Sequence, residues 1–191
     1  MKRNPESPWN PLKPCNVTPK EFEEQVLSWL KILSDDLNSF SVGHLKHLSG
    51  SGGDYEFDEV AEFIILNGAI IIVLIECKRY SRPVEREKIL SLYAKLQDVG
   101  AHKAIIFSTS GFQSGALSYA KDRGIACLTF VDGDFLYETK DVKGDHKPPP
   151  WANIPRYAAI LVEKENKSIH CSTISNNGID SLRDWLKLSE R

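Results

Sequence analysis

A charged tripeptide ends the most apolar segment of this 191-residue chain. The apolar run of residues 69–75 is followed directly by Glu76, Cys77 and Lys78. Side chains two positions apart on a strand share a face, so Glu76 and Lys78 are expected to lie side by side at the edge of the core. Burying either charge is costly unless another group compensates it. The pair therefore fits either a chemical site or a simple ion pair at the end of a strand.

A further carboxylate, Asp58, ends the preceding segment of residues 53–58. Two carboxylates and a lysine on neighbouring strands are the groups that a metal-dependent phosphodiester hydrolase needs, because carboxylates hold Mg²⁺ and the ion activates a water. Asp58 and Glu76 are the candidate ligands, with the Cys77 carbonyl as a candidate third, and Mn²⁺ could replace Mg²⁺. Lys78 would orient or deprotonate the water and neutralise developing charge.

The dipeptide Asn67-Gly68 between two apolar runs predicts a β-hairpin that makes the two strands antiparallel neighbours. A two-residue turn would place Asp58 opposite Cys77, on the face that Glu76 does not share. A three-residue connection or a bulge shifts the register by one residue and brings the site residues together. The hypothesis of a site therefore requires one of these two connections.

Hydrophobic periodicity predicts an α/β fold, with a mixed central sheet of about five strands and helices on both faces. The expected order of elements is α-β-β-β-α-β-α-β. The first helix should begin with a capping box formed by Thr18 and Glu21. The expected helices cover residues 19–34, 84–99 and 113–123, and the expected strands cover 39–48, 56–66, 69–78, 103–108 and 125–131.

Proline content divides the chain into four parts. Residues 1–17, which contain four prolines, are expected to form an extended N-terminal arm, and residues 18–139 the α/β domain. Residues 140–156 include three successive prolines and predict a stiff linker. Residues 157–191 are expected to form a small C-terminal extension that packs on the core or mediates assembly. Its expected elements are a strand over 157–164 and a helix over 179–188.

The composition limits the class of protein. A net charge of −2 argues against a protein that coats nucleic acid nonspecifically, although basic residues can gather locally. The four cysteines are far apart and indicate neither a zinc site nor a disulfide framework. The first residues lack the apolar stretch of a signal peptide, and no apolar run is long enough to span a bilayer. We expect a cytoplasmic protein with no membrane partner.

Basic residues gather directly after the charged tripeptide and suggest contact with phosphates. The candidates for nucleic-acid binding are Arg79, Arg82, Arg86, Lys88 and, before the third helix, Gln113. For Arg86 and Lys88 a solvated helix face shared with acidic neighbours is the alternative.

Several polar residues near the site are expected to be structural. Glu59 should face solvent or pair with a lysine, and His44 should be a solvated or core histidine because it has no companion at zinc-ligand spacing. The hydroxyls of Thr109 and Ser110 should cap the following helix, although amides there could also bind a phosphate.

The ordered set of Asp58 and residues 76–78 on this framework resembles the PD-(D/E)xK nuclease superfamily. Within it, the chain looks like the Mrr-type (type IV-like) restriction endonuclease domain. The segments that carry this likeness are 53–58, 76–78, 82–84, 100–103 and 107–116. The likeness extends from about Lys20 to Gly133. A lone Glu-x-Lys tripeptide would be weak support, whereas the whole ordered set is specific.

The resemblance implies a restriction-endonuclease-like fold and Mg²⁺-dependent endonucleolytic cleavage of double-stranded DNA. It places Asp58, Glu76 and Lys78 in the catalytic positions. A glutamate on the first helix often supports the site in that superfamily, and Glu23 is the matching residue. Many Mrr-type domains carry a glutamine where this chain has Glu76, so the added charge should tighten metal binding. The likeness also implies a bacterial or archaeal role in restriction and anti-phage defence.

Two other functions stay open at this point. One is a non-catalytic nucleic-acid-binding or assembly module with the same fold, although an unused site has no reason to keep burying charges. The other is a junction-resolving or repair nuclease. The sequence contains no evident DNA-reading module. Target recognition is therefore expected to come from a homodimer, a partner chain or the tail.

Overall fold

The computed structural model describes five ranges of the chain: residues 15–36, 40–65, 68–132, 155–165 and 168–186. Most of the predicted N-terminal arm and of the predicted linker lies outside these ranges. The helices within them are α1 (Pro19–Asp36), α2 (Arg86–Asp98), α3 (Ser114–Asp122) and α5 (Asp180–Leu186). The strands are β1 (Phe40–Gly50), β2 (Gly53–Ile65), β3 (Ala69–Lys78), β4 (Lys103–Ser108), β5 (Ile125–Asp132), β6 (Tyr157–Glu165) and β7 (Ser168–Ile174).

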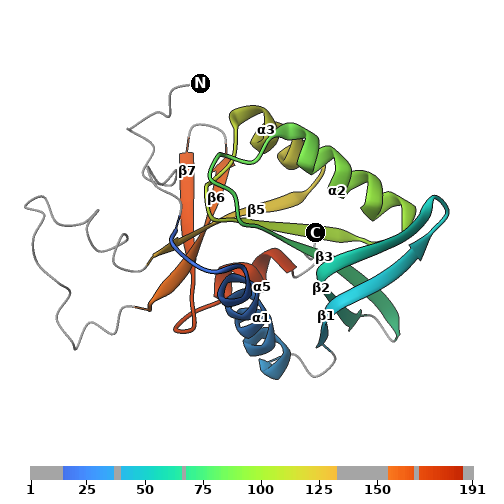
Figure 1. Ribbon diagram of the computed structural model, residues 1–191. Coiled ribbons are helices and arrows are strands. Elements are labelled where there is room, and N and C mark those ends of the chain that lie inside the picture. The colour runs from blue at the N-terminus through green and yellow to red at the C-terminus, as the bar shows by residue number, and fades with distance from the viewer. Residues whose placement is uncertain (1–14, 37–39, 66–67, 133–154, 166–167, 187–191) are drawn as a thin grey trace, which may run out of the picture.

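The strands form one mixed sheet in which they lie in chain order from β1 to β7. Pairing is antiparallel from β1 to β3, parallel from β3 to β5, and antiparallel again from β5 to β7. Helices α2 and α3 cover one face, and α1 and α5 cover the other (Figure 1). The predicted α/β fold class is confirmed, and the sheet has more strands than the predicted five or so.

The additional strands come from the C-terminal segment. Strand β6, which was predicted, pairs with β5, and β7 pairs with β6, so this segment continues the central sheet. Strand β7 was not predicted because its serine, histidine, cysteine and threonine residues give a weak hydrophobic pattern. Helix α5 then packs Leu182 and Leu186, with Ile179 directly before it, into the same core that α1 covers.

Helix α1 begins at the predicted capping box. The Thr18 amide donates to Glu21 Oε2 at 3.0 Å, and the Glu21 amide donates to Thr18 Oγ1 at 3.2 Å. The apolar side of the helix places Phe22 and Trp29 against Phe130, with ring centroids 4.8 and 5.5 Å apart. This packing fixes α1 on its face of the sheet. No helix in the described residues is long and apolar enough to cross a bilayer.

Lys103, at the start of β4, links α5 to the sheet through hydrogen bonds to the end of the helix. Its ammonium donates to the Trp185 carbonyl at 2.6 Å and to the Leu186 carbonyl at 3.4 Å, and it lies 4.6 Å from the centroid of the Trp185 ring. We expect Lys103→Met to lower the free energy of unfolding by about 1.5–3 kcal/mol, the usual contribution of hydrogen bonds to a charged group. Urea denaturation measures the loss.

The matched control is Lys20→Met. Lys20 is highly exposed on α1 and makes one ion pair, with Glu24, at 3.7 Å. Its replacement should change the free energy of unfolding by less than about 0.5 kcal/mol. Equal losses of unfolding free energy in the two variants would show that the contacts of Lys103 with α5 do not stabilise the fold.

Candidate active site

The connection between β2 and β3 sets the register of the site. Ile65 pairs with Ala69, so three residues, 66–68, join the two strands. This is the three-residue connection, one of the two connections that were predicted. Glu59 and Ile75 form the last pair of this ladder, which places Asp58 across from Glu76, one residue further along. The two carboxylates therefore meet at the end of the ladder, as the hypothesis of a site requires.

Strands β2 and β3 separate at this point, and the Asp58 side chain spans the gap. The Cys77 amide donates to Asp58 Oδ2 at 2.6 Å, so a carboxylate takes the place of a backbone acceptor. The β1–β2 pairing also omits Asp58 and its opposite residue, Leu45. Leu45 has a φ of 47°, a left-handed conformation that costs a leucine energy. The pairing of β2 with both neighbouring strands is thus interrupted at Asp58.

Lys78 lies between the two carboxylates. Its Nζ is 4.0 Å from Asp58 Oδ2 and is in direct contact with Glu76 Oε2. A second ammonium, that of Lys95 on α2, lies 3.4 Å from Glu76 Oε1. The three residues of the predicted site are therefore together, and a lysine that was not predicted joins them. Its spacing of three residues from the buried Leu92 is the sequence signal that places it on the sheet-facing side of α2.

The surroundings change the proton affinities of the site residues. Burial raises the pKa of Asp58 above its ordinary value, and the Cys77 amide and the Lys78 ammonium only partly oppose this effect. Burial alone would lower the pKa of Lys78, but the Glu76 and Asp58 carboxylates outweigh it and raise that pKa. Lys78 is therefore an ammonium at neutral pH and acts as a hydrogen-bond donor in this arrangement.

Three further titratable residues lie on the α1 side of Asp58. Partial burial and the charge of Asp58 raise the pKa of Glu23, which places the predicted supporting residue near the site. Glu59 is fully buried, and its Oε1 lies 2.8 Å from His44 Nδ1. The expectation that Glu59 faces solvent or pairs with a lysine is wrong, because Glu59 alternates with the core residues Ala61 and Phe63 on β2 and so points inward, beside the paired His44 of β1.

The donor set suits Mg²⁺, although it is small. Among the described residues no group of three or more His, Cys, Asp and Glu side chains is arranged to hold a metal ion. Mg²⁺, however, commonly takes one or two carboxylates and keeps several waters. Asp58 Oδ1 has no hydrogen-bond partner among the described residues, so this hard oxygen is available to a cation. In a strand the amide and carbonyl of one residue point the same way, so the Cys77 carbonyl also faces Asp58.

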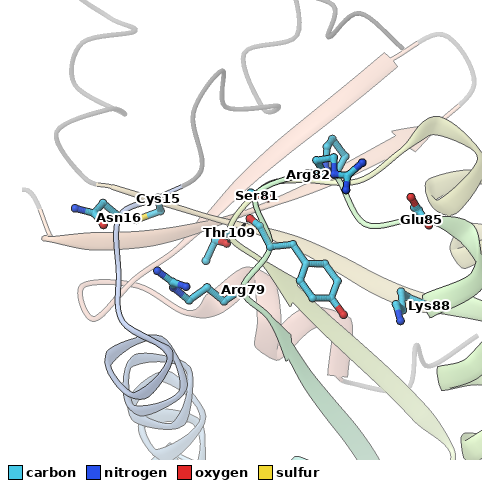
Figure 2. Close-up of a pocket in the computed structure, with 10 residues that line it drawn as sticks. Cys15, Asn16, Arg79, Ser81, Arg82, Glu85, Lys88 and Thr109 are labelled. Atoms are coloured by element: carbon cyan, nitrogen blue, oxygen red, sulfur yellow. Dashed lines mark hydrogen bonds between the residues drawn. The ribbon is translucent and has the colours of Figure 1, made fainter.

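A groove of about 710 Å³ begins where β3 ends. It is lined by Arg79, Arg82, Lys88, Glu85, Tyr80, Ser81, Pro83, Thr109, Cys15 and Asn16. Figure 2 shows Arg79 and Asn16 at one end of this groove and Glu85 and Lys88, from the start of α2, at the other. The groove is basic because three of these side chains are cations and one, Glu85, is a carboxylate. Its first basic residue, Arg79, directly follows Lys78 in the chain.

The structure separates the predicted nucleic-acid contacts into two groups. Arg79, Arg82 and Lys88 line the groove, and Arg79 also donates to the Val17 carbonyl. Arg86 and Gln113 do not line it: Arg86 lies over the Tyr119 ring of α3 at 5.1 Å, and Gln113 is the exposed residue that precedes α3.

The loop before α3 supports the groove from inside. Thr109 Oγ1 donates to the Tyr80 carbonyl at 3.3 Å, and Ser110 Oγ donates to the Arg82 carbonyl at 2.6 Å. The prediction that these hydroxyls cap α3 is wrong, because the N-cap position belongs to Gln113. Both hydroxyls are used to hold the 80–82 segment that carries the basic side chains.

Comparison with known proteins identifies the family. Residues 15–139 match the family model Mrr_cat, described as restriction endonuclease. The match covers well over half of the chain, so this protein belongs to the Mrr_cat restriction endonuclease family. It is also similar to the crystal structure of a protein of unknown function, AF1548, with 24% sequence identity, a TM-score of 0.43 and coverage of 56% of each chain. No curated protein matches the chain.

Proposed function

We propose that this protein is a metal-dependent DNA endonuclease with Asp58, Glu76 and Lys78 as its catalytic residues. The observation that carries the proposal is the convergence of two carboxylates, from β2 and β3, on the single Lys78 ammonium. Membership of the Mrr_cat family supports a nuclease activity and DNA as the substrate. We also propose restriction of foreign DNA in the cytoplasm as the biological setting, with a second copy or a partner chain supplying target recognition.

In this proposal Asp58 and Glu76 hold Mg²⁺ or Mn²⁺, with the Cys77 carbonyl as a third oxygen. The bound ion supplies charge for the scissile phosphate and acidifies a water. Lys78 donates hydrogen bonds to the attacking water or the phosphate and neutralises charge as the bond breaks. The raised pKa of Lys78 favours this orienting function over that of a general base. The Cys77 amide holds Asp58 Oδ2 in place throughout.

The basic groove is proposed to hold the DNA backbone beside the scissile phosphate. We expect the double variant Arg82→Ala/Lys88→Ala to reduce the slope of log K against log salt concentration by about 2, because each lost phosphate contact removes roughly 0.9. Fluorescence anisotropy of a labelled duplex over a salt series measures the slope. Arg183→Ala, on α5, changes a residue that does not line the groove and should leave the slope unchanged. An unchanged slope in the double variant would place the DNA elsewhere.

The proposed function is tested by incubating the purified chain with modified, unmodified and branched DNA, with and without Mg²⁺. Cleavage that requires Mg²⁺ or Mn²⁺ and is lost with a chelator supports the proposal. A strong preference for branched substrates would favour the junction-resolving alternative. Binding without cleavage of every substrate and with either ion would contradict the proposal and favour a non-catalytic module.

A further inference from the structure

Lys95 belongs to α2, well after the Glu-x-Lys segment, yet it reaches the same carboxylate as Lys78. Its Nζ lies 3.4 Å from Glu76 Oε1, whereas Lys78 contacts Glu76 Oε2. Glu76 is only 6% exposed, so water has little access to this residue. Each oxygen of this buried candidate metal ligand therefore faces one ammonium.

Several contacts fix Lys95 in this position. Its ammonium lies 5.2 Å from the centroid of the Phe57 ring and 6.0 Å from that of Tyr55, both on β2. Aromatic faces attract a cation more strongly as it loses water, and the Lys95 side chain is 30% exposed. The ammonium is thus held between β2 and β3 by an acidic group and two rings. It is not a loose surface lysine.

The charges of these groups oppose the uptake of a cation. Asp58 and Glu76 carry two negative charges, and Lys78 and Lys95 offset them with two positive charges. Interactions between charges this close are strong where burial keeps water away. A divalent ion that enters the free protein meets two ammoniums and must compete with Lys95 for Glu76 Oε1. A DNA phosphate brings negative charge and attracts both the ion and the lysines.

We propose that Lys95 is a positioning residue that couples metal binding to DNA binding. In the free protein it holds Glu76 Oε1 and keeps metal affinity low. In the complex a DNA phosphate offsets its charge, and Glu76 Oε1 becomes available to the ion. This inference rests on the proposed function. Because coupling between two ligands is reciprocal, the metal ion must tighten DNA binding by the same factor as DNA tightens metal binding.

Calorimetric titration with Ca²⁺, a probe ion that also binds oxygen ligands, tests the proposal in the full chain with and without a DNA duplex. Lys95→Met removes the charge and keeps an unbranched side chain. In the absence of DNA we expect this variant to bind Ca²⁺ about ten-fold more tightly than the wild type, the scale on which neighbours of metal ligands act. The gain in Ca²⁺ affinity on adding DNA should be about ten-fold smaller in the variant than in the wild type, because the phosphate still attracts the ion and Lys78 still contacts Glu76.

Three further variants keep the test decisive. Lys95→Arg retains the charge and should retain the coupling, and Lys95→Gln serves as a second uncharged variant should the methionine protein fail to fold. Lys88→Met changes a lysine on the same helix that lines the groove. It should weaken DNA binding without changing the Ca²⁺ affinity of the free protein.

The outcomes separate this inference from the proposed function. Equal Ca²⁺ affinity of the free wild-type and uncharged Lys95 proteins, with coupling to DNA unchanged, would overturn the assignment of Lys95 alone. A wild-type protein that takes up neither Ca²⁺ nor Mn²⁺, with or without DNA, would overturn the proposed function as well.

Discussion

The Asp58→Asn protein is expected to lose metal-dependent cleavage of DNA and to be more stable than the wild type. The carboxamide keeps an acceptor for the Cys77 amide but removes the charge that would hold the metal. We expect a loss in cleavage rate of at least about 10⁴-fold, since removing a group on which a catalytic unit depends costs about this much. Single-turnover cleavage of supercoiled plasmid with Mg²⁺ measures the loss.

The gain in stability follows from the raised pKa of Asp58. The folded protein binds this proton more tightly than the unfolded chain, so stability is lost as pH rises through the raised pKa. At neutral pH the ionised carboxylate therefore destabilises the fold, and the asparagine variant should melt about 2–4 °C higher, the shift that about 1 kcal/mol produces in a chain of this size. The difference should shrink as the pH falls toward about 4.

Thermal unfolding in the presence of a chelator is the measurement that checks this gain. Asp54→Asn is the matched control, because Asp54 is exposed on the same strand. It should change neither the melting temperature nor the cleavage rate. If the Asp58→Asn protein cleaves DNA at the wild-type rate, Asp58 does not belong to the catalytic site. If this variant melts at a lower temperature than the wild type at neutral pH, the ionised Asp58 carboxylate does not destabilise the fold.

The Lys78→Met protein is expected to cleave DNA about 10³-fold more slowly than the wild type. A positioned group that transfers or donates a proton in the transition state usually contributes 10²–10⁴-fold. The variant also removes the cation between the two carboxylates, so their repulsion should grow and metal binding should tighten. A lower cleavage rate together with tighter metal binding would distinguish Lys78 from a metal ligand.

Lys46→Met provides the control for this variant. Lys46 forms a comparable ion pair, 2.8 Å from Glu62 Oε1, on the neighbouring strands. Its replacement should leave the cleavage rate within about two-fold of the wild type, as for surface ion pairs that contribute little. If Lys78→Met and Lys46→Met cleave DNA equally well, Lys78 has no catalytic function.

The local pattern of the sequence was sufficient to predict how Asp58, Glu76 and Lys78 come together. The two-residue period of a strand requires that Glu76 and Lys78 share a face, and the same period shows that Asp58 joins them only if the hairpin connection has three residues. The pairing of Ile65 with Ala69 bears this out. These predictions succeed because register depends on chain geometry between neighbouring strands.

The features that were not predicted depend on contacts between distant elements. The contact of Lys95 with Glu76 requires the docking of α2 on the sheet, which no local pattern specifies. The burial of Glu59 depends on the core between α1 and the sheet and on the histidine opposite. The polar composition of β7 gives no strand pattern in the sequence, and the strand forms because it pairs with β6.

The position of a bound metal ion would show whether Asp58 and Glu76 hold the same cation. Crystals of the full chain with duplex DNA and Mn²⁺ would give an anomalous map in which the ion stands out from the protein. We expect one peak about 2.2 Å from oxygens of both Asp58 and Glu76, beside the Lys78 ammonium. A peak that touches neither carboxylate, or no peak at a saturating Mn²⁺ concentration, would contradict this expectation.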